Sequence, residues 1–215
     1  MPTNYTVKQG DYIASIAKSY GLWDQTVWND SHNAALKALR KTPNVLNPGD
    51  QVYVPDQDTT GYQRPTDAQH KFQVQRTKVT LVLVLEDMYE KPIANAKCVL
   101  TVNGDSHQLT TDGSGKLTQE IPPDSHAGTL VIQDAQTPFE NTVFNVKIGY
   151  MTPVTEVSGQ LARLDNLGYV PGDGSEDQSE AFESAVEEFQ CDNGLTVDGV
   201  CGPLTQAKLK QVYGC

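Results

Sequence analysis

The chain has 215 residues and a formal net charge of −11, with 16 lysines and arginines against 27 aspartates and glutamates. An excess of negative charge repels polyanions, so nucleic acid is not an expected partner. No stretch approaches the roughly 18 consecutive apolar residues of a membrane span, and membrane insertion is not expected either. The acidity is uneven, because residues 152–215 carry three basic and eleven acidic side chains.

Residues 1–56 have the pattern of a strand, two helices and a closing strand. A short strand begins at Tyr5 and stops at Gly10, and apolar residues then recur at helical spacing until Gly21. A second helical stretch follows, and the Asn-Pro-Gly-Asp turn at residues 47–50 leads into a strand rich in valine.

Residues 5–11, Tyr-Thr-Val-Lys-Gln-Gly-Asp, resemble the opening strand and turn of LysM domains, and residues 46–55 resemble the closing turn and strand of that family. Residues 28–45 form a longer middle than is usual, and this long form is similar to LysM modules of phage-tail and contractile-secretion loci. The resemblance implies two facing turns that hold N-acetylglucosamine, where glycine and proline let the backbone approach the sugar. The residues of this predicted glycan site are Gly10, Asp11, Tyr12, Ile13, Asn44, Val45, Leu46 and Pro48.

A substitution in either turn is expected to weaken glycan binding at this site. A charged side chain should block the sugar, so Ile13→Asp or Leu46→Asp is expected to weaken binding by about 1 to 3 kcal/mol and to leave the fold unchanged. The two tryptophans, Trp23 and Trp28, belong either to the core or to a binding platform, and at least one is expected in the core.

The middle of the chain has β-type patterns. Residues 57–71 are polar and aperiodic, as in a linker, whereas residues 72–151 contain several short β-rich runs that predict an antiparallel β-sandwich. The run from Val79 to Leu85 predicts a buried strand. Two segments, at residues 90–96 and 111–117, resemble Ig-like or transthyretin-like modules, which implies a scaffold rather than a chemistry.

Residues 152–215 show three amphipathic helical stretches. Residues 195–205 strongly resemble the signature loop of the three-helix peptidoglycan-binding domain, whereas residues 171–177 depart from the short turn that the family usually has before its second helix. The apolar sides predicted for the helices are Leu161, Leu164 and Leu167, then Phe182, Val186 and Phe189, then Leu204, Ala207 and Val212. The second wall-binding site that the resemblance implies consists of Tyr169, Asp198, Gly199, Gly202 and Gln206.

Three of the four cysteines lie close together in the last segment. A disulfide between Cys191 and Cys201 is predicted, because nine intervening residues close easily and such a loop stabilises by roughly 2 to 3 kcal/mol. Pairing of Cys215 with either of them is the alternative, and whether Cys215 has a partner stays open. Cys98 stands in an apolar run and is expected to be buried in a strand.

Residues with catalytic chemistry do not form a recognisable constellation. The four histidines include no pair at i, i+4 and no HExxH, so a zinc peptidase is not expected. Cys98 lies mid-strand rather than at a helix N-terminus, where a reactive thiolate is usual. The acids around Glu187 fall on the helix face opposite its apolar side, which predicts a solvated surface.

These patterns together predict an α+β multidomain protein with a βααβ LysM domain, an antiparallel β-sandwich and a three-helix peptidoglycan-binding domain. The expected function is non-catalytic binding of peptidoglycan or a chitin-like glycan, without cofactor or metal, as an accessory of a phage-tail-like or contractile secretion apparatus. A targeting subunit or part of a peptidoglycan hydrolase is one alternative, and a structural protein–protein adaptor is another.

The N-terminal residues contain no visible secretory signal. A protein made in the cytoplasm is therefore expected to reach the periplasm or cell wall by non-classical export. The expected domains are residues 1–56 (LysM-like), 57–71 (linker), 72–151 (β-sandwich) and 152–215 (peptidoglycan-binding-like).

Overall fold

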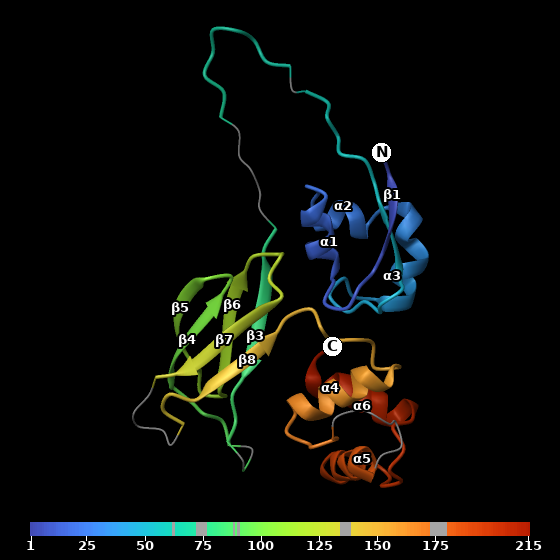
Figure 1. The fold of residues 1–215 in the computed structure, drawn as a ribbon, viewed down its shortest axis with the longest axis vertical. Coiled ribbons are helices and arrows are strands. Elements are labelled where there is room, and N and C mark those ends of the chain that lie inside the picture. Colours follow the sequence, from blue (N-terminus) through green and yellow to red (C-terminus); the bar gives the residue numbers. More distant parts are fainter. Residues whose placement is uncertain (62, 72–76, 88, 90, 134–138, 173–179) are drawn as a thin grey trace. The chain divides into compact units, whose positions relative to one another are not determined.

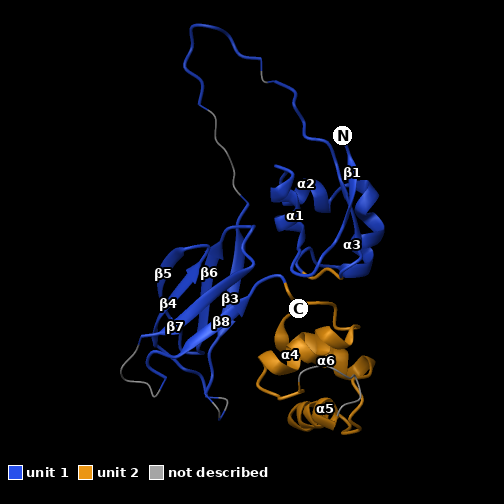
Figure 2. Cartoon of the chain, in the orientation of Figure 1, with its two compact units in different colours: residues 1–44, 48–149 blue, residues 45–47, 150–215 orange. Residues whose placement is uncertain are grey.

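The computed structural model shows an α+β protein (Figure 1). It describes residues 1–61, 63–71, 77–87, 89, 91–133, 139–172 and 180–215. The start predicted for the β-domain, residue 72, and the loop residues 173–177 lie outside the described residues. The chain divides into unit 1, residues 1–44 with 48–149, and unit 2, residues 45–47 with 150–215 (Figure 2). Within the described residues, no helix is long and apolar enough to cross a membrane.

The N-terminal module is built on a two-stranded antiparallel sheet. Strand β1 (Thr3–Thr6) pairs with β2 (Gln51–Val54), so that the first and last strands of the module are neighbours. The prediction had two helices between these strands, but the described chain forms three helices and a 3₁₀ turn. These segments are α1 (Ile13–Ser19), α2 (Asp24–Trp28), η1 (Ser31–Asn33) and α3 (Ala34–Arg40).

Two polar contacts tie the extra helical segments to the sheet and to the closing turn. The buried amide of Asn33 donates to the carbonyls of Val27 and Tyr53, both at 2.8 Å, and its oxygen accepts from the Tyr53 N–H at 2.8 Å. Arg40 and Asp50 form a two-point ion pair with both distances at 2.7 Å. Such paired geometry fixes the orientation of both groups, so α3 is held against the turn that precedes β2.

The β-module of unit 1 has two antiparallel sheets that share one apolar core. Strand β3 (Val79–Val84) pairs with β6 (Lys116–Ile121). The second sheet has the order β5 (Asp105–Thr110), β4 (Lys97–Val102), β7 (Ala127–Ile132) and β8 (Val143–Lys147). Cys98 is fully buried in β4, as predicted.

The prediction that β3 is buried throughout was wrong. Its side chains alternate, and Val82 and Val84 are about half exposed, whereas Leu81 and Leu83 pack against the core. The reason is that β3 belongs to a two-stranded sheet with only one packed face, so every second side chain points away from the core.

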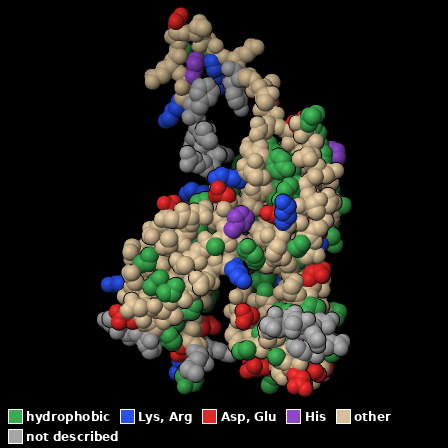
Figure 3. Space-filling model, in the orientation of Figure 1, with side chains coloured by type: hydrophobic (Ala, Val, Ile, Leu, Met, Phe, Trp, Pro, Cys, Tyr) green, Lys and Arg blue, Asp and Glu red, His purple; other side chains and the backbone are tan. Residues whose placement is uncertain are grey.

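Unit 2 contains α4 (Val157–Asn166), α5 (Glu180–Asp192) and α6 (Pro203–Tyr213). All three residues predicted for the apolar side of α5 are buried. The apolar side predicted for α6 was wrong, because Leu204, Ala207 and Val212 are exposed, whereas Thr205 and Leu209 are buried. Acidic side chains recur over the surface of this helical unit in Figure 3.

Arg163 of α4 is the largest fully buried side chain in unit 2. Its guanidinium donates to the carbonyls of Thr152, Gly159 and Cys215 at 2.7 to 2.9 Å. Burial lowers the pKa of Arg163, but an arginine remains charged at neutral pH. These three bonds join residue 152, the helix α4 and the last residue of the chain, which follows α6.

Candidate glycan-binding site

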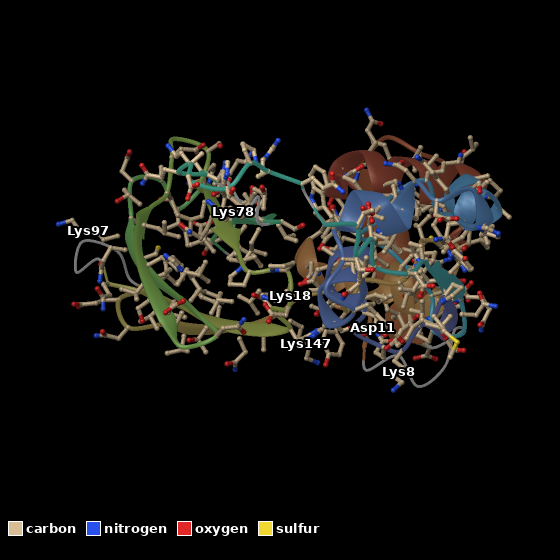
Figure 4. All side chains as sticks on the ribbon, turned by 90° about the horizontal axis from the view of Figure 1, so that it is seen from above. Lys8, Asp11, Lys18, Lys78, Lys97 and Lys147 are labelled. Atoms are coloured by element: carbon tan, nitrogen blue, oxygen red, sulfur yellow. The ribbon has the colours of Figure 1, made fainter. Side chains whose placement is uncertain are left out.

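The first turn predicted to hold a sugar contacts the chain just before the second predicted turn. The N–H of Ile13 donates to the carbonyl of Pro43 at 3.0 Å. Gly10 has a φ of 93°, a backbone conformation that favours glycine. The carboxylate of Asp11 accepts from the Lys8 N–H and from the Tyr5 hydroxyl, both at 2.8 Å. Figure 4 labels Lys8 and Asp11 on this turn. The Asp11 carboxylate therefore stabilises this turn through hydrogen bonds to other residues of the same protein.

Most of the apolar residues of the predicted site are inaccessible to a ligand. Tyr12 is 2% exposed, Ile13 is fully buried and Leu46 is 3% exposed. Val45 is also buried. The other four residues of the predicted site range from buried to exposed. Gly10 is buried, Asp11 is half-buried, and Asn44 and Pro48 are exposed. The expectation that Ile13→Asp or Leu46→Asp would leave the fold unchanged is therefore wrong, because both side chains are core residues.

Tyr12 is buried because it packs against the β-module of the same unit. Its hydroxyl donates to the carbonyl of Ser125 at 2.9 Å, and it belongs to the apolar core that the two sheets share. The Nδ1 atom of His126 lies 3.2 Å from the carbonyl oxygen of Gly10. A Cβ added to Gly149 would lie 2.5 Å from that oxygen and 2.6 Å from the Tyr12 ring. The β-module therefore covers the first predicted turn.

The loop of the second predicted site is held by the buried side chain of Gln190 on α5. The amide oxygen accepts from the N–H groups of Asp198 and Gly199 at 2.9 and 3.1 Å. The amide nitrogen donates to Asp198, Val200 and Thr205 at 2.8 to 3.1 Å. One side chain thus fixes the loop between α5 and α6, and it also turns Thr205 toward the interior. The apolar pattern of α6 alone did not reveal this polar anchor.

The residues predicted for the second site mostly stabilise the loop. The Val200 N–H and the Gln190 amide lower the pKa of Asp198 below its usual value. Gly199 has a φ of 67°, and a Cβ there would lie 2.6 Å from Glu183. The other three residues make contacts at the end of α5 and the start of α6. Tyr169 donates to Asp192 at 3.1 Å, Gly202 caps α6, and Gln206 donates to the carbonyl of Cys201 at 2.9 Å.

Three of the side chains exposed on the loop and at the start of α6 are apolar, and the sequence did not single them out as a group. Val197 is 51% exposed, Val200 is 62% exposed and Leu204 is 80% exposed. The available signal was their position within the signature loop, where valine and leucine stand between turn residues. They are the accessible apolar groups nearest to the predicted second site along the chain.

The disulfide predicted between Cys191 and Cys201 is not formed in the structure. Cys191 is exposed on α5, whereas Cys201 is partly buried and packs against the apolar core of unit 2. Burial raises the pKa of the Cys201 thiol to about 11, so the thiol stays protonated at neutral pH and is not activated as a nucleophile. Within the described residues, no group of three or more His, Cys, Asp or Glu side chains could hold a metal ion.

Comparison with known families agrees with this geometry at both ends of the chain. The family model described as LysM domain matches residues 5–32, and that described as putative peptidoglycan binding domain matches residues 153–209. The terminal modules are therefore a LysM domain and a peptidoglycan-binding domain, and both families are binding domains rather than catalytic ones. No curated protein and no solved structure matches the chain.

The buried position of Leu46 predicts a loss of stability on substitution. Leu46→Asp should lower the free energy of unfolding by about 3 kcal/mol or more, because it places an unpaired charge in the core. Leu39→Asp is the matched control, since Leu39 is 65% exposed on α3. Urea unfolding followed by circular dichroism should show a large change only for Leu46→Asp. Equal stability of the two variants would mean that Leu46 is accessible, as the glycan site requires.

The buried hydroxyl of Tyr12 predicts an alkaline transition. Burial raises the pKa of Tyr12 to about 12, so the neutral hydroxyl stabilises the fold fully below pH 10, and this contribution is lost as the pH rises from 10 through 12. Tyr12→Phe should cost about 1 kcal/mol at pH 7 and should make the decline in stability between pH 10 and 12 shallower. Melting temperatures across this range measure both effects. Tyr89→Phe, at a 71% exposed tyrosine, should leave the decline in stability between pH 10 and 12 unchanged. An equal decline in the Tyr12→Phe and Tyr89→Phe variants would contradict the role assigned to the Tyr12 hydroxyl.

Proposed function

We propose that this chain is a non-catalytic protein that binds bacterial peptidoglycan with its two terminal modules acting on one polymer. The observation that carries the proposal is the presence of two matched wall-binding domains on a single chain, at residues 5–32 and 153–209. Two weak modules gain effective concentration when their sites recur along the same polymer. The N-acetylglucosamine-containing glycan is the ligand proposed for the N-terminal module.

The proposed setting is a phage-tail-like or contractile secretion apparatus that carries the protein to the periplasm or cell wall. The long segment at residues 28–45 supports this, because it is similar to LysM modules of such loci. In this chain the segment forms η1 and α3, and the Arg40–Asp50 pair anchors it.

This setting predicts that the protein co-purifies with the apparatus. Particles isolated from the source cells should contain the chain at a fixed ratio to the structural subunits, as measured by quantitative mass spectrometry. Recovery of the chain only in the soluble fraction, with none in washed particles, would contradict the proposed setting without affecting wall binding.

Two other functions make different predictions in the same assay with purified sacculi. A hydrolase, or a subunit that targets one, would release muropeptides alone or with its enzyme. A protein–protein adaptor would neither sediment with sacculi nor release fragments. The absence of a described metal-ligand cluster does not by itself decide between these functions, so the assay must measure both binding and release.

We expect the intact protein to sediment with sacculi and to release no muropeptide. The bound fraction should persist at moderate salt, because a net charge of −11 gives no general attraction to an anionic wall. Pelleted protein is measured on gels and released fragments by chromatography. Full recovery in the supernatant at both low and moderate salt would refute the proposal, and release of muropeptides would refute its non-catalytic part.

A further inference from the structure

Unit 1 contains a hollow with a volume of about 800 Å³ that the predicted glycan turns do not line. This volume lies within the range of about 300 to 1,000 Å³ that is usual for small-molecule sites. The hollow is formed by α1, the segment from Gly21 to Trp23, the two residues before β3, the start of β5, and the end of β6 with the two prolines that follow it. Its apolar lining residues are Ala14, Leu22, Trp23, Ile121, Pro122 and Pro123.

The two tryptophans of the chain have different environments, although Trp23 directly precedes the short helix α2 and Trp28 is its last residue. Trp28 is 6% exposed and belongs to the core, whereas Trp23 is 50% exposed and lines the hollow. The Trp23 carbonyl accepts from the Thr26 and Val27 N–H groups at 3.0 and 3.3 Å, which fixes its backbone at the start of the helix. A large aromatic side chain on a fixed backbone position, and left half exposed, is suited to stacking on an apolar ligand face.

The charges around the hollow are balanced. Two lysines, Lys18 and Lys78, and two acids, Asp105 and Glu120, line it, so the lining carries no net formal charge when His107 is neutral. Lys78 is paired with Glu120, and Figure 4 labels both lysines. Lys18 also lies 3.4 Å from the carboxylate of Asp124. A lining whose cations are already neutralised gives no advantage to a polyanion, and its carboxylates and His107 can hydrogen-bond to hydroxyl and amide groups.

We propose that this hollow is a glycan subsite that takes a neutral N-acetylated sugar chain, with Trp23 stacking on a sugar face. The proposal rests on the proposed function and names where in unit 1 the sugar binds. The proposal is compatible with the covered first turn. The β-module packs against Gly10 and Tyr12, whereas Ala14 and Lys18 of the following helix α1 line the open hollow. The polar groups of Asp105, Glu120 and His107 hold the hydroxyl and amide groups of the ligand.

Fluorescence of single-tryptophan variants tests this assignment in the full chain. Trp28→Phe leaves Trp23 as the sole tryptophan, and Trp23→Phe leaves Trp28. Titration with the pentamer of N-acetylglucosamine should shift the emission of the Trp28→Phe variant to shorter wavelength, because stacking removes the half-exposed indole from water. The emission of the Trp23→Phe variant should stay constant, since Trp28 is buried in the free protein.

Calorimetry provides the second readout and its matched control. Trp23→Ala should weaken pentamer binding about tenfold or more, as for a central aromatic contact. Tyr89→Ala removes a 71% exposed aromatic side chain outside the hollow and should leave the affinity unchanged. Binding of the neutral sugar should change by less than about twofold between low and high salt, because no ion pair forms on binding.

The outcomes separate this subsite from the general function. Pentamer binding with constant Trp23 emission, and with equal affinity in Trp23→Ala, would overturn the subsite and leave the wall-binding function in place. The subsite is also refuted if the wild type does not bind the pentamer at millimolar concentration, even where sacculi still pellet the protein. Failure to sediment with sacculi, together with a Trp23-dependent pentamer signal, would instead support the subsite and contradict the proposed function.

Discussion

The hydroxyl of Tyr12 donates to the carbonyl of Ser125, which lies 113 positions further along the chain. Around this bond, the Tyr12 ring enters the core of the β-module, and Gly149 approaches Gly10 so closely that no Cβ would fit. The LysM domain and the β-module of unit 1 therefore share one apolar core. A turn that resembles a sugar-binding turn is used for packing, and access to α1 remains on the side where Trp23 and Lys18 line the hollow.

Gln190 has the corresponding role in unit 2. Its buried amide makes five hydrogen bonds to the loop before α6 and to Thr205, so the loop conformation depends on a side chain from another helix. The loop can then expose Val197 and Val200 without collapsing onto the core, because its own polar groups are already satisfied. Both modules thus combine internally bonded turns with exposed apolar side chains, which can pack against the apolar faces of sugar rings.

The predictions from sequence succeeded where the signal was local and periodic, and failed where a distant residue decided the outcome. Glycine at the end of α1 and the apolar spacing of α5 were enough to predict those helices, and the terminal families were evident from their turn residues. The apolar side of α6 was wrong because Gln190 binds Thr205 across the unit. Burial of Tyr12 depends on Ser125, and no local pattern encodes that contact. The hollow lined by Trp23 was missed because its residues come from segments about 100 positions apart. The sequence indicated only that each tryptophan could lie either in the core or on a binding platform.

The central claim is that two modules on one chain bind a single polymer. It is tested most directly by competition, in which labelled protein bound to intact sacculi is displaced either by unlabelled sacculi or by the same sacculi digested to short soluble fragments. At equal sugar concentration the intact polymer should compete at least about tenfold better, because only it engages both modules at once. Equal competition by fragments and intact sacculi would show that one site accounts for all of the binding, and would contradict the claim.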